Sequence, residues 1–210
     1  MDYSLYLVTD ASLSRGRAHD VIVLAAIRGG VTVVQYREKN ASTRQMIEEA
    51  LALREMCRAH NVPFIVNDRV DVALAVDADG VHVGQEDMPA PFARKLIGRG
   101  KILGVSAENV AQARAAIADG ADYIGASPIF ATPTKPDAPS PIGVEGLQEL
   151  AHACAIPIVA IGGLNVTNAG SMIRAGAAGV AVISAIMGAE DVERAARELR
   201  AIVEQSRRDL

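Results

Sequence analysis

The chain has 210 residues, 50% of them hydrophobic and only 3% aromatic, so we expect an aliphatic core rich in Ala, Val, Ile and Leu. The formal net charge of -4 supplies no overall basic field, which argues against nucleic acid as a partner and requires any anion site to be local. The start of the chain lacks the basic residues of a signal peptide, and no apolar stretch approaches the roughly 20 residues that span a bilayer, so we expect a cytoplasmic protein without a membrane partner.

Short β-branched runs alternate with alanine-rich amphipathic stretches along the whole chain, which is typical of βαβ units. Eight such runs predict a single-domain TIM (β/α)8 barrel over residues 1–210, with the functional residues at the carboxyl ends of the strands. A doubly wound open sheet is the alternative, because counting strands does not prove that the sheet closes. The expected strands are Leu5–Val8, Val31–Tyr36, Phe64–Asn67, Gly80–Val83, Ile102–Val105, Tyr123–Ala126, Ile158–Ile161 and Val180–Ser184.

Capping residues and glycines mark the helices between these strands. Glycine follows three of the amphipathic stretches, at Gly29-Gly30, Gly120 and Gly176, where it suits a left-handed helix cap and a short return to the next strand. The helices expected from start signals are Arg44–His60 after Ser42-Thr43, Ala107–Asp119 after Ser106, Asn168–Ala175 after Asn165 or Thr167, and a last helix over Glu190–Ser206.

The second strand ends in the polar run Gln35-Tyr36-Arg37-Glu38-Lys39. Because side chains alternate in direction along a strand, Gln35, Arg37 and Lys39 should share one face. An amide and two cations that point the same way indicate an anion site, and the alternative is an ordinary solvated strand end. Tyr36 and Glu38 should face the other way and contribute mainly to structure.

Two aspartates follow the third and fourth strands. Asp68 comes directly after Asn67, and Asp87 closes the run Gly84-Gln85-Glu86-Asp87, so their carboxylates could converge near the cations of the second strand. Such a pair suits Mg²⁺, which takes one or two protein carboxylates and completes its octahedron with phosphate oxygens and water. The alternative is that each aspartate caps a turn or a helix. His82, inside the fourth strand, is expected to be a hydrogen-bonded core residue rather than a base.

The last three strands lead into loops that suit phosphate. The sixth is followed by a long proline-rich loop over residues 127–143, in which Lys135 could swing onto a leaving group, and a disordered surface insert is the alternative. Gly162-Gly163 after the seventh strand and Ser184 at the end of the eighth indicate a second phosphate site, where glycines expose backbone N–H groups. A simple chain turn is the other interpretation of the glycine pair.

These features, in this order, resemble the thiamine phosphate synthase family over nearly the whole chain. No single motif is decisive, but a chance match of seven motifs in the same order is not a good explanation. The matching runs are Gln35 to Lys39, Asn67-Asp68, His82 to Asp87, Gly104-Val105-Ser106, Thr132-Pro133-Thr134-Lys135, Gly162-Gly163 and Ile183-Ser184.

The resemblance implies a (β/α)8 barrel that joins hydroxymethylpyrimidine diphosphate to a thiazole phosphate, releasing diphosphate by a dissociative mechanism with Mg²⁺. Carried onto this chain, it implies that the pyrimidine diphosphate binds Gln35, Tyr36, Arg37, Glu38, Lys39, Asn67, Ser106 and Lys135. It places Mg²⁺ on Asp68 and Asp87, and the thiazole phosphate at Thr132, Pro133, Thr134, Gly163, Ile183 and Ser184. The catalytic residues would be Arg37, Lys39, Ser106 and Lys135.

Three other functions remain as alternatives. A thiazole tautomerase shares the barrel and the second phosphate site, a Schiff-base aldolase would use Lys39 or Lys135, and a non-catalytic sensor would bind one phosphorylated metabolite. The diphosphate and metal residues are all present, which favours the synthase over the tautomerase. The sensor would leave Asp68 and Asp87 without a purpose. Whether the chain forms a homo-oligomer is not decided by its sequence.

Overall fold

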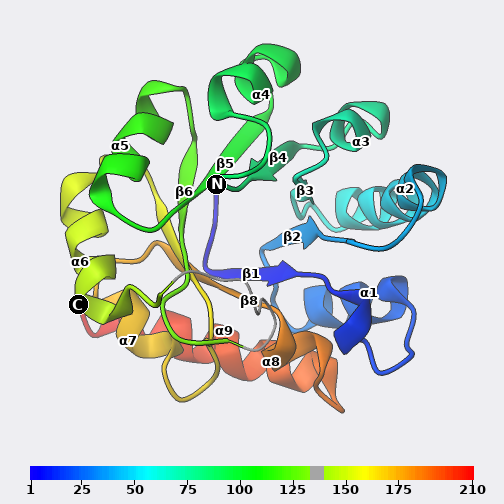
Figure 1. Cartoon of the computed structure of the whole chain (residues 1–210). Helices are drawn as coiled ribbons and strands as arrows, with labels where there is room; N and C mark the ends of the chain where they lie inside the picture. The colour runs from blue at the N-terminus through cyan, green and yellow to red at the C-terminus, as the bar shows by residue number, and fades with distance from the viewer. Residues whose placement is uncertain (133–139) are drawn as a thin grey trace.

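A computed structural model describes residues 1–132 and 140–210 of the chain. Within these ranges eight parallel strands form a closed barrel in chain order, with the helices arranged around it (Figure 1). The prediction of a TIM barrel over an open sheet is therefore confirmed. The strands are β1 (Leu5–Val8), β2 (Val33–Tyr36), β3 (Phe64–Asn67), β4 (Gly80–Val83), β5 (Ile102–Ala107), β6 (Tyr123–Ala126), β7 (Ile158–Ile161) and β8 (Gly179–Val182).

The barrel closes where the first strand meets the last. Leu5 pairs with Val180 and Leu7 with Val182, so β1 lies between β2 and β8. Most strand residues are apolar and fully buried, as expected for a parallel sheet that is covered on its outer face by helices and filled by side chains inside.

Helices on the outside connect successive strands. Ser42, predicted with Thr43 as a helix-start signal, caps the helix α2, and its capping box with Gln45 is a further feature of the structure. The chain turns back after three helices through glycines with left-handed backbone, at Gly30, Gly120 and Gly176. Within the described ranges the helices are α1 (His19–Arg28), α2 (Thr43–Ala59), α3 (Val70–Ala75), α4 (Ala90–Ile97), α5 (Val110–Ala118), α6 (Gly143–Ala153), α7 (Ala169–Arg174), α8 (Ser184–Met187) and α9 (Val192–Arg208).

Several predicted boundaries were wrong by a few residues. Ser106 does not open a helix but lies in β5, and α5 is capped instead by Asn109, whose side chain accepts from the backbone N–H of Gln112. Ser184 does not end a strand but begins the short helix α8, because β8 ends at Val182. β5 is longer than predicted because Ser106 and Ala107 still pair with Gly125 and Ala126 of β6, whereas in β8 pairing stops at Val182 although the apolar run continues.

The core has two parts. The larger part lies between the strands and the surrounding helices and is mostly aliphatic, as the composition predicted. The smaller part fills the barrel and contains three of the four tyrosines of the chain, Tyr3, Tyr6 and Tyr123, all nearly inaccessible to solvent. Three of the seven aromatic residues of the chain therefore fill the barrel interior.

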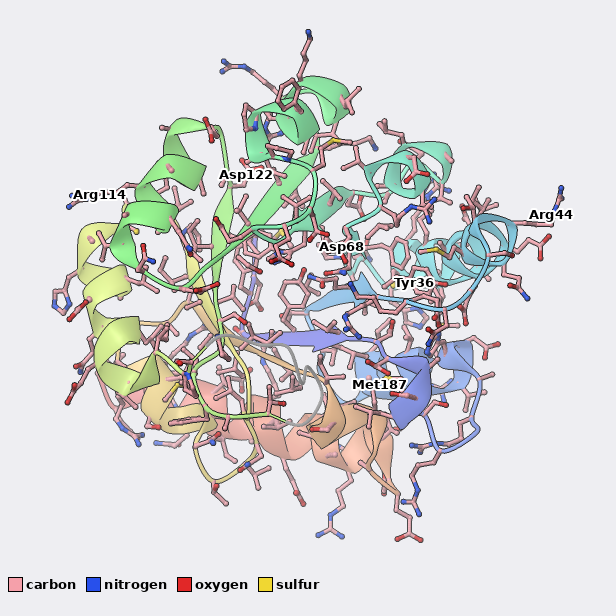
Figure 2. All side chains as sticks on the ribbon, in the orientation of Figure 1. Tyr36, Arg44, Asp68, Arg114, Asp122 and Met187 are labelled. Carbon is pink, nitrogen blue, oxygen red and sulfur yellow. The ribbon has the colours of Figure 1, made fainter. Side chains whose placement is uncertain are left out.

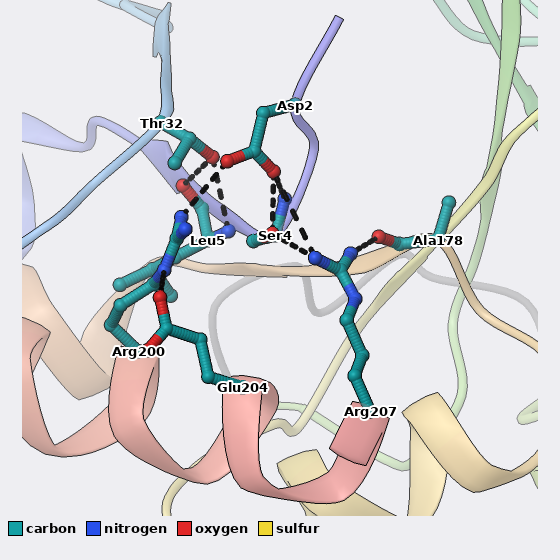
Figure 3. Close-up of polar contacts among 8 residues, drawn as sticks. All are labelled: Asp2, Ser4, Leu5, Thr32, Ala178, Arg200, Glu204 and Arg207. Atoms are coloured by element: carbon teal, nitrogen blue, oxygen red, sulfur yellow. Dashed lines mark hydrogen bonds and ion pairs between the residues drawn. The ribbon is translucent and has the colours of Figure 1, made fainter. Parts of the chain in front are cut away.

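Helix α9 connects the end of the chain to its beginning (Figure 3). Arg207 donates to the Ser4 hydroxyl and to the Ala178 carbonyl, and Arg200 Nη1 lies 3.1 Å from Asp2 Oδ2. These contacts join α9 to the segment before β1 and to the residue before β8. No helix among residues 1–132 and 140–210 is long and apolar enough to cross a membrane.

Candidate active site

A cavity of about 420 Å³ opens at the carboxyl ends of the strands, where the barrel fold predicts a site. Asp68, labelled in Figure 2, lies toward the middle of the ring, whereas Arg44 and Arg114 project from outer helices. Pro133, Thr134 and Lys135 lie outside the described residues. The predicted site residues that line the cavity are Gln35, Arg37, Lys39, Asn67, Asp68, Asp87, Ser106, Thr132, Gly163, Ile183 and Ser184.

Arg37 is held in place by the end of β1. Its Nη1 lies 2.5 Å from Asp10 Oδ2, and its backbone N–H donates to the Thr9 hydroxyl at 3.0 Å. Asp10 itself is fixed, because its other carboxylate oxygen accepts from the backbone N–H of Ser12 at 3.0 Å. The sequence analysis missed Asp10, although its position directly after a strand was the available signal.

Lys39 and the two predicted metal ligands form one group. Lys39 Nζ lies 2.8 Å from Asp68 Oδ2, and Asp87 Oδ2 accepts from the backbone N–H of Gly84 at 2.8 Å. Burial raises the pKa of Asp87, and a hydrogen bond with Asp68 and the negative charge of Asp68 raise it further. The prediction that the two carboxyl groups converge is therefore correct.

The donor set at this point fits Mg²⁺. Two neighbouring carboxylates supply the hard oxygen ligands that Mg²⁺ prefers, and their mutual repulsion would be relieved by a divalent cation. Among residues 1–132 and 140–210 no group of three or more His, Cys, Asp or Glu side chains is arranged to hold a metal. A metal at Asp68 and Asp87 would thus depend on oxygens from substrate and water, as Mg²⁺ commonly does.

Tyr36 and Glu38 point away from the cavity, as the alternation of the strand predicted. Tyr36 is fully buried under α2, where its hydroxyl donates to Glu49 Oε2 at 2.7 Å. Glu38 accepts from the backbone N–H of Asn40 at 2.7 Å and shapes the turn after β2. Neither lines the cavity, so their inclusion in the predicted binding set is corrected as far as their side chains are concerned.

The opposite side of the cavity is formed by the ends of β7 and β8. Gly162 and Gly163 both have left-handed backbone, with φ of 108° and 65°. They pack against the start of the long loop, since a Cβ on Gly162 would lie 2.9 Å from Pro128 Cα. The backbone N–H of Phe130 donates to the Gly162 carbonyl at 3.1 Å, which anchors the loop here. Ser184 faces the same cavity.

A row of largely buried polar side chains, which we call the buried polar chain, forms part of the floor of the cavity. Gln35 Nε2 is 2.9 Å from the Tyr6 hydroxyl, which is 2.7 Å from the Tyr123 hydroxyl. His82 Nδ1 is 2.9 Å from the Tyr123 hydroxyl, and His82 Nε2 is 2.9 Å from Ser106 Oγ. Burial lowers the pKa of His82 to about 4, against a smaller opposing effect of the Asp87 charge. His82 is thus a neutral, hydrogen-bonded core residue, as expected.

Further polar side chains line the cavity and were not predicted as site residues: Tyr6, His82, Gln85, Glu86, Glu108, Tyr123 and Ser127. Gln85 Nε2 donates to the Ser106 carbonyl at 2.6 Å and so joins the loop after β4 to β5. Gln85 and Glu86 belong to the run His82 to Asp87 that carries part of the family resemblance, but only Asp87 of that run was predicted as a site residue. Glu108 follows β5, and its place at a strand end was again the available signal.

Known proteins are similar to this chain over almost its full length. A family model described as thiamine monophosphate synthase matches residues 5–186. A thiamine-phosphate synthase of Chloroflexus aurantiacus is 64% identical over 203 residues, which are 97% of this chain and 94% of that protein. The chain belongs to the thiamine-phosphate synthase family. A second thiamine-phosphate synthase, from Moorella thermoacetica, is 54% identical over 205 residues, or 98% of each chain.

A solved structure of the thiamine phosphate pyrophosphorylase from Pyrococcus furiosus is also similar. It has a TM-score of 0.91 and 46% identity, and the alignment covers 98% of this chain and 97% of that one. Membership of the thiamine-phosphate synthase family makes the chain an enzyme, a transferase of thiamine biosynthesis built on a TIM barrel. The family resemblance stated from the sequence is confirmed.

Proposed function

We propose that this thiamine-phosphate synthase family member joins hydroxymethylpyrimidine diphosphate to a thiazole phosphate, forming thiamine phosphate and releasing diphosphate. The observation that carries the proposal is a single cavity with two distinct anion-binding sides. Arg37, Lys39 and the aspartate pair lie on the side of β2 to β4, and Gly163 and Ser184 lie on the side of β7 and β8. Two phosphorylated substrates could thus bind at once, with their reactive atoms between them.

The diphosphate would bind on the side of the cations. The bond between the pyrimidine methylene carbon and the diphosphate oxygen breaks, and its electron pair leaves with the oxygen. Arg37, Lys39 and, from the long loop, Lys135 would neutralise the developing charge there. Asp68 and Asp87 would hold Mg²⁺, which when bound supplies further positive charge to the leaving group.

The thiazole phosphate would bind on the opposite side, at the backbone N–H groups near Gly163 and Ile183 and at the hydroxyls of Ser184, Thr132 and Thr134. There the thiazole ring nitrogen gives its lone pair to the methylene carbon, and the new C–N bond replaces the broken C–O bond. Neither step needs a protein nucleophile or a proton transfer. The protein would act by holding both substrates in line and keeping water from the cationic intermediate.

Asn67 and Ser106, which also line the cavity between these sides, would hold the pyrimidine diphosphate. We also propose that the chain acts in the cytoplasm, where such phosphorylated metabolites would be available to it.

The test is turnover by the purified chain with both substrates and Mg²⁺, measured as thiamine phosphate and diphosphate formed. We expect Asp68→Ala or Asp87→Ala to lose at least about a hundredfold of metal-dependent turnover, because the leaving group loses its counter-charge. Asp71→Ala is the matched control, since Asp71 is exposed and bonded to Arg69 outside the cavity.

Absence of product from the intact chain would refute the proposal. Trapping of Lys39 or Lys135 by borohydride with a carbonyl substrate would support the aldolase instead. Metal-independent turnover would contradict the role given to the two aspartates.

A further inference from the structure

In the buried polar chain, only one assignment of donors and acceptors gives every hydroxyl proton an acceptor. Gln35 Nε2 can only donate, so the Tyr6 oxygen accepts from it. The single proton of Tyr6 then goes to the Tyr123 oxygen, and the single proton of Tyr123 goes to His82 Nδ1. Buried hydroxyls rarely leave a proton unused, which makes this order the satisfied one.

The direction fixes the tautomer of His82. Its Nδ1 accepts from Tyr123 and therefore carries no proton, so the ring proton is on Nε2, which donates to Ser106 Oγ at 2.9 Å. Ser106 Oγ therefore accepts the hydrogen bond from His82, and the Ser106 O–H can donate to a different group. Ser106 lines the cavity, and the donated proton is thus directed to whatever binds there.

The barrel makes room for this arrangement with two glycines. A Cβ on Gly104 would lie 2.2 Å from Tyr123 Cζ, and a Cβ on Gly125 would lie 3.0 Å from His82 Cε1. Both glycines are in the middle of buried strands, where glycine costs stability relative to residues with side chains. The space they leave is occupied by the two rings of the buried polar chain, which indicates that the ring positions are closely specified.

We propose that Tyr6, Tyr123 and His82 are positioning residues that hold the Ser106 hydroxyl as a hydrogen-bond donor toward the cavity. All three also line the floor of the cavity, but the role proposed for them is exerted through Ser106. The matching group on a ligand is an acceptor that carries no proton, such as an aminopyrimidine ring nitrogen or a diphosphate oxygen. This last identification rests on the proposed function, whereas the direction of the chain does not.

The first test reads the tautomer directly in the full-length protein without substrates. A long-range proton–nitrogen correlation spectrum of nitrogen-labelled protein at about neutral pH should show His82 protonated on Nε2 and unprotonated on Nδ1. In Tyr123→Phe, which removes the donor to Nδ1, the preference should give way to a mixture of tautomers. A proton on Nδ1 in the unaltered protein would overturn the proposal, whatever the outcome of activity measurements.

The second test separates positioning from general damage. Tyr123→Phe should lower kcat/KM for the pyrimidine diphosphate about tenfold, while KM for the thiazole phosphate stays within about twofold. Tyr3→Phe is the control, because the Tyr3 ring packs on Tyr123 with centroids 4.9 Å apart but its hydroxyl is not part of the buried polar chain. It should change neither value by more than about twofold.

A double variant tests whether Tyr123 acts through Ser106. If Tyr123 acts through Ser106, then Tyr123→Phe should cost less than about twofold in a Ser106→Ala background, because the hydroxyl that it orients is already absent. Equal losses in both backgrounds, or equal effects on both substrates, would overturn the positioning role.

Discussion

At the scale of single residues, the cation side of the cavity is set by a carboxylate that does not face substrate. Asp10 uses one oxygen to close the turn after β1 and the other to hold Arg37. Both side chains of this pair are mostly buried, with 16% of Arg37 and 12% of Asp10 exposed, so the guanidinium has little freedom to move. Arg37 is therefore preorganised before a diphosphate arrives.

We expect Asp10→Asn to lower kcat/KM for the pyrimidine diphosphate about tenfold, because Arg37 loses the charged partner that fixes its orientation. Steady-state kinetics with each substrate varied in turn measures this. The thiazole phosphate, which would bind across the cavity, should keep its KM.

Asp122→Asn is the matched control for Asp10→Asn. Arg94 Nη2 and Asp122 Oδ2 are also 2.5 Å apart, but Asp122 directly precedes β6 and so lies at the amino end of the strands, opposite the cavity. Its loss should affect stability and leave both KM values unchanged. An unchanged or higher kcat/KM in Asp10→Asn would show that the negative charge of Asp10 opposes diphosphate binding more than its positioning helps.

At the scale of elements, a buried histidine ties α1 to α2 and β2. His19 Nδ1 lies 2.8 Å from Glu49 Oε1, and Glu49 Oε2 accepts from Tyr36. Burial lowers the pKa of His19, but its hydrogen bond with Glu49 and the charges of Glu49, Glu38 and Asp10 outweigh this and raise it overall. The hydrogen bond with His19 lowers the pKa of Glu49 despite its burial.

These opposite shifts define a pH window for stability. The raised pKa of His19 contributes stability that is fully present below its ordinary value of 6.5 and is lost as the pH rises through the folded value. The lowered pKa of Glu49 contributes stability above its ordinary value of 4.5, lost as the pH falls through the folded value. The ion pair is therefore strongest between these two ordinary values.

We expect His19→Gln to lower the free energy of unfolding by about 1 kcal/mol near pH 5.5 and by less near pH 9, a small effect because Glu49 is partly open to solvent. Urea denaturation at both pH values measures the difference. His152→Gln is the control, since His152 is exposed on α6 and bonded to the Gln148 carbonyl rather than to a carboxylate. A deficit that is the same at both pH values would show that His19 acts by packing alone.

The strands and the barrel were predictable because local pattern determines them. Short apolar runs such as Ile158–Ile161 indicate buried strands. Ser42 with Gln45 marks the start of a helix within four residues. The position of Asp10 after a strand was visible in the sequence, but its contact with Arg37 and the buried polar chain were not predictable, because the partners come from different strands and depend on register around the barrel. Ser184 was placed in a strand because pattern alone does not show where pairing with the neighbouring strand stops.

At the scale of the whole molecule, closure joins the two ends of the chain. Arg207 on α9 contacts Ser4 and the Ala178 carbonyl, so one side chain bridges the segments that lead into β1 and β8 (Figure 3). We expect Arg207→Gln to lower Tm by about 2–4 °C for a loss near 1 kcal/mol, with kinetics unchanged because the contact is remote from the cavity.

Calorimetry measures the effect of Arg207→Gln, and Arg208→Gln is its matched control. Arg208 follows directly on the same helix but donates to Gln205 of α9 itself, at 2.8 Å, and so bridges nothing. Equal Tm values for the two variants would contradict a role of Arg207 in fastening the closure.

The pairing of Leu5 with Val180 also has a consequence for biosynthesis. The first strand of the barrel needs the eighth as its neighbour, so one edge of β1 stays open until β8 has been synthesised. Its backbone N–H and C=O groups are meanwhile available to any other extended segment, including a second nascent chain. The barrel can thus close only after β8 has been synthesised.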